Sequence, residues 1–318
     1  MNFADNTIGS LGGSGSSFEE SLRKDIQKRR QESDSFSRAR SRRRLMLFAG
    51  IGGLIIVLVI IVGGVSPLII PNRQQTQIFD LGFGITLEMV FIPGGSFQMG
   101  SPNSESVRDD DEGPVHRVEL DGFWIGKYEV TQAQYRVIMG TNPSHLKGDN
   151  RPVERVSWDD AMEFCRKLSQ KTGKRFTLPT EAQWEYACRA GTTGPFAFGN
   201  CLSTSDANYK GNYPLSGCSK GRYLKSTWDV GSGRANAWGL YDMHGNVWEL
   251  CLDWYGEDYY SESPRRNPVG PGSGSYRVCR GGGWNLYARG CRSAYRVWSA
   301  PSFTYGNLGF RLVMTDSS

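Results

Sequence analysis

The feature that most constrains the fold of this chain is a run of uncharged, mostly apolar residues near its N-terminus. Residues 45–65 contain no Asp, Glu, Lys or Arg and consist mainly of Leu, Ile, Val and Gly. At the rise of an α-helix, such a run spans the hydrocarbon core of a bilayer. A signal peptide is the competing interpretation, but signal peptides start near the N-terminus and have a shorter apolar core. The run therefore predicts a transmembrane helix over residues 45–65.

The segments on either side of this run predict the topology of the chain. Residues 1–44 carry ten Lys or Arg and six Asp or Glu, so a net charge of +4 out of +5 for the whole chain. Few large apolar residues occur there, so we expect a mostly disordered tail. The arginines just before residue 45 indicate a cytoplasmic N-terminus. The chain is therefore predicted to be a single-pass protein of the cell (inner) membrane, with a stalk over residues 66–80 and an extracytoplasmic domain over residues 81–318.

The basic tail has two interpretations. It is either only a topology signal, which we favour, or a surface that binds anionic lipid or a cytoplasmic partner. The rest of the chain is close to neutral, which gives no indication of a nucleic-acid partner. The 40 glycines and 9 tryptophans instead indicate a loop-rich domain in which large aromatic side chains pin irregular segments.

Local patterns predict both strands and helices in this domain. Two short strands around a Pro-Gly-Gly turn are expected over residues 89–100, an alternating strand over residues 114–125, and a closing strand over residues 309–313. Capping-box spacing begins at Thr131, Ser157 and Thr180, and predicts helices that end near residues 139, 171 and 189. Residues 190–236 show little periodicity and are expected to be irregular.

The cysteines and histidines show no metal-binding spacing. No C-x-x-C pair occurs among the seven cysteines, which argues against a zinc ribbon or a thioredoxin motif. Cys201 and Cys218 lie in one loop-rich region and form a disulfide if the compartment is oxidising; the alternative is that they are unpaired. Cys165 and Cys188 fall on helix faces and are expected to be core thiols. The three histidines are far apart in sequence and are each expected to be structural; they are His116, His145 and His244.

Two acidic segments are candidate cation sites. Residues 239–249 read GLYDMHGNVWE, in which Asp242 and Glu249 flank Gly245 and Asn246. A Gly-Asn turn brings carboxylates and backbone carbonyls toward one point, and such all-oxygen surroundings suit calcium. The alternative is a tight turn with two solvated acids. Residues 105–112 form a second acidic segment, for which a solvated loop is the favoured interpretation.

The stretch at residues 239–249 and several other segments together resemble the formylglycine-generating enzyme, or sulfatase-modifying factor, family. The matching segments are MVFIPGGSF (89–97), VTQAQY (130–135), PVERVSW (152–158), LPTEAQWEYA (178–187), RGGGW (280–284) and GFR (309–311). This resemblance runs from about residue 89 to residue 313. It implies an α+β domain of the formylglycine-generating-enzyme fold, which is related to the C-type lectin fold.

The resemblance also implies calcium sites. In the family the stretch at residues 239–249 holds a calcium ion, and its ligands correspond here to Asp242 and Glu249 with backbone oxygens of Gly245 and Val247. A possible second site corresponds to Asn208-Tyr209. The segment Lys220-Gly221-Arg222 stands near the place of its partner aspartate, so that ligand has no clear match.

The family's chemistry is the oxygen-dependent oxidation of a sulfatase cysteine to formylglycine, with copper held by two cysteines. Copper(I) favours two thiolates close together. Counted from the glycine turn, the two positions correspond to Leu286 and Cys291, so Cys291 is the candidate catalytic residue and its partner position holds a leucine. Gly283 replaces the family's serine. A rearranged pair of Cys279 and Cys291 is an alternative of low weight.

Three functions follow from these observations. A binding or degenerate member of the family is slightly favoured, an active formylglycine-generating oxidoreductase is the first alternative, and a ligand-binding protein with a diversified C-terminal loop is the second. The predicted ligand surface combines exposed-type aromatics with arginine, as recognition surfaces do; it comprises Trp284, Tyr287, Arg289, Tyr295, Trp298, Phe303 and Tyr305, with Arg292 and Arg296 interleaved. Packing of these aromatics in the loop core is the alternative. The predicted partner is a protein or peptide outside the cytoplasm.

Overall fold

The computed structural model describes residues 75–315. Three predicted segments therefore lie wholly or mostly outside the described residues: the basic tail over residues 1–44, the transmembrane helix over residues 45–65 and the stalk over residues 66–80. Between residues 75 and 315, no helix combines the length and the apolar content needed to cross a membrane.

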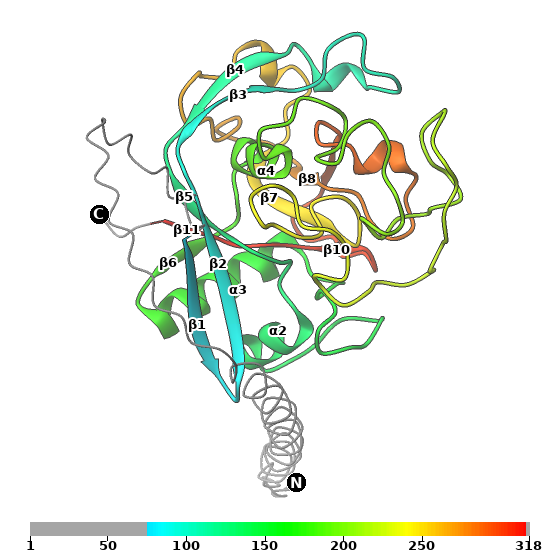
Figure 1. Ribbon diagram of the computed structural model, residues 1–318. Coiled ribbons are helices and arrows are strands. Elements are labelled where there is room, and N and C mark those ends of the chain that lie inside the picture. The colour runs from blue at the N-terminus through cyan, green and yellow to red at the C-terminus, as the bar shows by residue number, and fades with distance from the viewer. Residues whose placement is uncertain (1–74, 316–318) are drawn as a thin grey trace, which may run out of the picture. The chain divides into compact units, whose positions relative to one another are not determined.

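A five-stranded antiparallel sheet forms the first layer of the domain (Figure 1). Its strands, in spatial order, are β1 (Thr76–Gly82), β2 (Ile85–Ile92), β5 (Phe123–Gly126), β11 (Val313–Thr315) and β6 (Arg175–Thr177). Strand β1 begins at Thr76, within the predicted stalk, and pairs along its length with β2, while Leu81 is buried in the core. The strand therefore starts before residue 81, where the sequence predicted the domain to begin.

Three α-helices begin at the predicted caps. They are α2 (Gln132–Met139), α3 (Trp158–Thr172) and α4 (Glu181–Arg189). In each helix, the N-cap hydroxyl accepts a hydrogen bond from the backbone N–H of the third helical residue. The side chain of that third residue accepts a hydrogen bond from the N-cap backbone N–H. Helices α2 and α3 pack together, and α2 contacts β1 and β2.

The remaining strands form two smaller sheets. Strands β3 (Gly95–Met99) and β4 (His116–Leu120) form a hairpin. A four-stranded sheet has the order β10 (Leu308–Gly309), β7 (Trp248–Trp254), β8 (Arg277–Arg280) and β9 (Arg296–Ser299), with only β10 and β7 parallel. Helix α4 contacts β3, β7 and β8, so it lies between these two sheets (Figure 1).

Two predicted strands are interrupted in the structure. The strand expected over residues 114–125 is divided into β4 and β5 at Asp121 and Gly122. The closing strand is divided into β10 and β11, because residues 310–312 cross from one sheet to the other. On the way, the carbonyl of Phe310 accepts a hydrogen bond from the N–H of Val130, and that of Leu312 accepts one from the N–H of Gly126 at the end of β5.

Residues 190–247 contain no helix or strand, and this stretch includes residues 190–236, which the sequence predicted to be irregular. This segment is nevertheless ordered by buried side chains, including Phe196, Leu202 and Tyr209, which pack with Cys291. Three single-turn 3-10 helices complete the domain: η1 (Asp110–Glu112), η2 (Tyr259–Ser261) and η3 (Ala288–Cys291).

Candidate functional site

The turn at residues 239–249 joins three segments that are far apart in sequence. The N–H of Gly245 donates to the carbonyl of Gly281, and the N–H of Asn246 donates to the carbonyl of Asn208. Gly245 has φ +95°, and a Cβ there would lie 2.3 Å from the Asn208 carbonyl oxygen. Only glycine therefore permits this close approach.

The two carboxylates of the turn are buried and hydrogen-bonded, so the alternative of solvated acids is wrong. Asp242 accepts from the indole N–H of Trp228 at 2.8 Å and from the N–H of Gly231 at 2.7 Å. Glu249 accepts from the Arg311 guanidinium through both oxygens, each at 2.5 Å, and from the Trp184 indole at 2.7 Å.

A third buried carboxylate, which the sequence reasoning did not identify, lies against the same turn. Glu129 accepts from the Asn246 side chain at 2.6 Å and from the N–H of Val247 at 3.1 Å. Burial, followed by the negative charges of Asp242 and Glu249, raises the pKa of Glu129 well above its usual range. Burial also raises the pKa of Asp242.

The oxygen atoms and the negative charge of this turn are of the kind that a hard cation prefers. Glu129, Asp242 and Glu249 are three buried acids, and Arg311 is the guanidinium that pairs with Glu249, so negative groups are in excess. Carboxylate and carbonyl oxygens are calcium ligands. Within residues 75–315, however, no three Asp, Glu, Cys or His side chains converge at metal-binding distance. The carboxylate oxygens face N–H donors instead.

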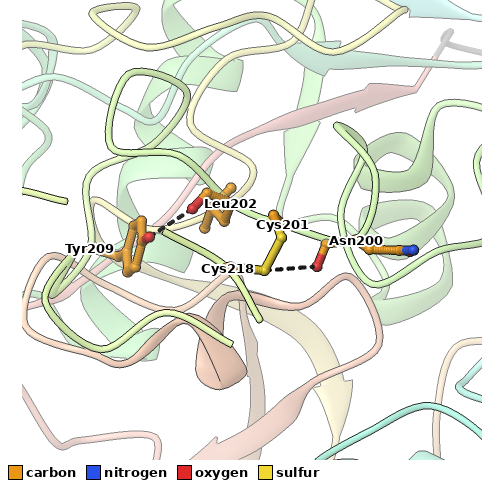
Figure 2. Close-up of a disulfide and its surroundings, with 5 residues drawn as sticks. All are labelled: Asn200, Cys201, Leu202, Tyr209 and Cys218. Carbon is orange, nitrogen blue, oxygen red and sulfur yellow. Dashed lines mark hydrogen bonds between the residues drawn. A yellow bond between two sulfur atoms is a disulfide. The ribbon is translucent and has the colours of Figure 1, made fainter. Parts of the chain in front are cut away.

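The segment of the possible second calcium site bonds to the same turn. Asn208 donates to the Asn246 side chain at 3.2 Å and to the carbonyl of Ser226 at 2.9 Å. The Tyr209 hydroxyl donates to the carbonyl of Leu202 at 2.7 Å, as Figure 2 shows.

Figure 2 also shows the disulfide between Cys201 and Cys218, which closes the loop that contains Tyr209. The disulfide lines a pocket of about 350 Å³ whose opposite wall is formed by residues 104–106. The sequence left this pair open between a disulfide and two free thiols, and the structure contains the disulfide.

The candidate catalytic residue Cys291 lies beneath the glycine turn. Its side chain is fully buried, and a Cβ on Gly282 would lie 2.6 Å from its sulfur. Burial raises the pKa of the Cys291 thiol to about 12. The neutral thiol is therefore the dominant form at neutral pH, whereas metal binding requires the thiolate.

No second thiol stands at the partner position. Leu286 is half-buried and packs near Gly290, against a core cluster that includes Trp248 and Cys279. Cys291 packs in a separate cluster with Phe196 and Tyr209, so the structure gives no support to a rearranged pair of Cys279 and Cys291.

His244 and Cys188 lie closer to Cys291 than the sequence indicated. The Nδ1 of His244 donates to the carbonyl of Cys291 at 2.8 Å, and its Nε2 accepts from the N–H of Ala197 at 3.0 Å. The Cys188 sulfur lies 3.7 Å from the same Nε2. Burial lowers the pKa of His244 to about 4 and raises that of Cys188 to about 12. These contacts agree with the expected structural roles of His244 and Cys188.

The aromatic residues of the predicted ligand surface divide by exposure. Tyr287, Trp298, Phe303 and Tyr305 each expose roughly half of their surface, whereas Trp284 and Tyr295 are half-buried. Trp284 donates through its indole to the carbonyl of Gly306, so the loops that carry Tyr287 and Tyr305 lie side by side.

The sequence interpretation placed three arginines among the exposed aromatics, but only one of them is exposed. Arg289 is exposed and pairs with Asp109 at 2.8 Å. Arg292 and Arg296 are buried in ion pairs with Glu112 and Glu181, so interleaving them with exposed aromatics was wrong. The pair between Arg292 and Glu112 also fixes the acidic segment at residues 105–112, which is therefore not a freely solvated loop.

Together the fold and this region define an α+β domain with long irregular loops, built around a buried acidic turn and a glycine turn over a buried cysteine. Residues 84–316 match the sulfatase-modifying factor enzyme 1-like domain, and the chain belongs to that family.

Characterised relatives include formylglycine-generating enzymes. The enzyme of Streptomyces coelicolor is 34% identical over 285 residues, which cover 71% of this chain and 88% of the relative. Among solved structures, PvdO from Pseudomonas aeruginosa is 31% identical with a TM-score of 0.65, and covers 75% of this chain and 97% of its own. Treponema denticola variable protein 1 is 29% identical with a TM-score of 0.65, and covers 75% and 98%.

Proposed function

We propose that this chain is a non-catalytic, ligand-binding member of its family. The observation that carries the proposal is the pair of positions at which the resemblance expects copper-binding cysteines. One position is Leu286, and the other is Cys291, whose buried thiol has a pKa of about 12. A copper(I) site that needs two thiolates is not available from these two side chains.

The first alternative is an active formylglycine-generating oxidoreductase, which the similarity to the Streptomyces coelicolor enzyme favours. The test is incubation of the full chain with copper, oxygen and a Cys-x-Pro-x-Arg peptide, followed by mass spectrometry of the peptide cysteine. We expect no conversion to formylglycine by the wild type or by Cys291→Ala. Conversion by the wild type that is lost in Cys291→Ala contradicts the proposal.

Leu286→Cys is the informative variant for this alternative, because it supplies the missing second thiol. Copper binding by this variant, measured by competition with a chromogenic copper(I) chelator, is expected to exceed that of the wild type. Equal and tight binding by the wild type would show that other ligands serve the metal, and would favour the oxidoreductase.

The second alternative is a ligand-binding protein with a diversified C-terminal loop. The exposure of Tyr287, Phe303 and Tyr305 on loops supports it, as does the similarity to a Treponema denticola protein described as variable. Sequencing of this locus in many isolates is the test. Substitutions concentrated between residues 285 and 306 would favour diversification, and an even distribution would contradict it.

We further propose that residues 45–65 anchor the chain in the cell membrane, with the domain outside the cytoplasm. The disulfide between Cys201 and Cys218 supports this placement, because disulfides persist in oxidising compartments. Protease added to spheroplasts is expected to degrade the domain while cytoplasmic marker proteins survive. Protection of the domain in intact spheroplasts would contradict the orientation.

The calcium site also remains a proposal. Asp242, Glu249 and the carbonyls of Gly245 and Val247 would hold the ion, with Glu129 adding negative charge nearby. A bound calcium ion would hold the segments of the turn together and would take no part in redox chemistry.

A further inference from the structure

Two loops of the domain lie side by side at the edge of the glycine turn. The N–H of Lys210 donates to the carbonyl of Leu286 at 2.8 Å, and the N–H of Ala288 donates to the carbonyl of Tyr213 at 3.1 Å. These bonds place Tyr213 against Tyr287. Their rings stack with centroids 4.2 Å apart and an interplanar angle of 14°, yet both side chains remain more than 40% exposed.

A lysine ammonium lies among three tyrosine rings at this place. The Nζ of Lys210 is 4.6 Å from the ring centroid of Tyr213, 5.1 Å from that of Tyr287 and 5.6 Å from that of Tyr223. These three rings are called the tyrosine cage below. Tyr223 in turn stacks on Trp284 at 6.3 Å. No carboxylate of residues 75–315 forms an ion pair with Lys210. The Lys210 ammonium therefore interacts with the cage through cation–π contacts.

The positive charge around the cage is not compensated. Between Asp206 and Asp229 the chain carries four cations and no Asp or Glu; they are Lys210, Lys220, Arg222 and Lys225. The last three are exposed, and none of the four forms an ion pair within the described part of the chain. Arg289, two residues after Tyr287 in the sequence, does have a partner, Asp109. The chain outside its N-terminal tail is nearly neutral, so this charge is a local feature.

We propose that the tyrosine cage and the basic segment beside it bind an acidic peptide segment that carries an aromatic side chain. This inference rests on the proposed binding function and names its partner. Exposed tyrosine rings can stack with an aromatic ring of a ligand, and the unpaired lysines and arginine attract its carboxylates. A polyanion without aromatic rings would use the cations but would offer no π face to the stacked tyrosines, so the combination favours a peptide over an anionic polysaccharide.

The test is binding of fluorescent peptides to the full chain by anisotropy. The probe is a peptide of repeating Glu-Glu-Phe units, and the control peptides carry Ala in place of Phe or Lys in place of Glu. We expect the Glu-Glu-Phe peptide to bind, and we expect its affinity to fall as the salt concentration rises. Equal binding of the Ala peptide or of the Lys peptide would overturn the proposal.

Variants locate the binding. Tyr213→Ala with Tyr287→Ala is expected to weaken binding by about tenfold or more, as loss of central aromatic anchors does. Lys220→Ala with Arg222→Ala is expected to weaken it and to reduce its salt dependence. Phe83→Ala, at an exposed aromatic in the turn between β1 and β2 and outside the predicted ligand surface, is the matched control and is expected to bind like the wild type.

Two further outcomes would overturn the inference. One is unchanged binding in both cage and basic-segment variants. The other is heparin binding that depends on Lys220 and Arg222 but not on Tyr213 and Tyr287, which would assign the surface to anionic polysaccharides. Formylglycine formation by the wild type would overturn the proposed function instead, and would leave the peptide measurements as a separate result.

Discussion

The ion pair between Arg311 and Glu249 gives the sharpest stability prediction for this domain. Both side chains are completely buried, and Arg311 also donates to the carbonyls of Gly126 at 3.1 Å and Tyr241 at 2.9 Å. In Arg311→Met, Glu249 loses its cation while two other buried acids, Glu129 and Asp242, remain nearby. Breaking a buried ion pair from one side typically costs about 3–5 kcal/mol.

The assay is urea and thermal unfolding of Arg311→Met, with and without added calcium. At about 2–4 °C per kcal/mol for a domain of this size, we expect Tm to fall by about 6–20 °C. The double variant Glu249→Gln with Arg311→Met should recover part of the loss, because it removes the unpaired charge. Arg266→Met is the control, since its ion pair with Asp121 is exposed to solvent and contributes little to stability.

Two results would refute this reasoning. One is a loss in Arg311→Met no larger than that in Arg266→Met, which would mean that water or a cation compensates the acids. The other is a double variant that is less stable than Arg311→Met alone, which would mean that the unpaired charge of Glu249 is not the source of the loss.

Three further predictions concern the turn, the disulfide and the buried histidine. Chelation of calcium is expected to lower Tm in the wild type and not in Asp242→Asn; an unchanged Tm in both contradicts the calcium proposal. Replacing Cys201 and Cys218 by Ser is expected to cost about 3 kcal/mol in urea unfolding, because the disulfide closes a loop of sequence separation 17. Burial lowers the pKa of His244 from 6.5 to about 4, so between these pH values His244 is protonated in the unfolded chain and neutral in the folded chain. Stability should therefore fall by about 3 kcal/mol as pH drops from 6.5 to 4, and this slope should flatten in His244→Gln; an identical pH profile in both proteins would refute the assignment.

Local sequence signals predicted the elements that depend on neighbouring residues. The caps at Thr131, Ser157 and Thr180 fix where α2, α3 and α4 begin, because each hydroxyl satisfies an N–H only three residues away. Gly245 was identified as a turn residue for a similar reason.

Strand boundaries were predicted less well, because strands end where a distant partner ends. Strand β1 was missed although its pairing with β2 is a local hairpin, whereas the closing strand was divided because residues 310–312 cross between two sheets. No local pattern signals that crossing.

At the candidate site, the sequence by itself determined which residue types are present and which are missing. It established that Leu286 occupies a position where a second thiol was expected, and that Asp242 and Glu249 flank a glycine turn. It could not identify Glu129, more than 100 residues away, as the third acid at this turn.

Only the tertiary structure decided how those groups behave, because burial and charge pairing depend on contacts between distant segments. It buried Cys291 and so raised the pKa of its thiol, and it paired Arg292 and Arg296 with internal glutamates rather than leaving them at the surface. By the same kind of contact it brought Lys210 beneath exposed tyrosines from two loops. Desolvation and ion pairing act over a few ångströms in space, and distance along the chain does not report them.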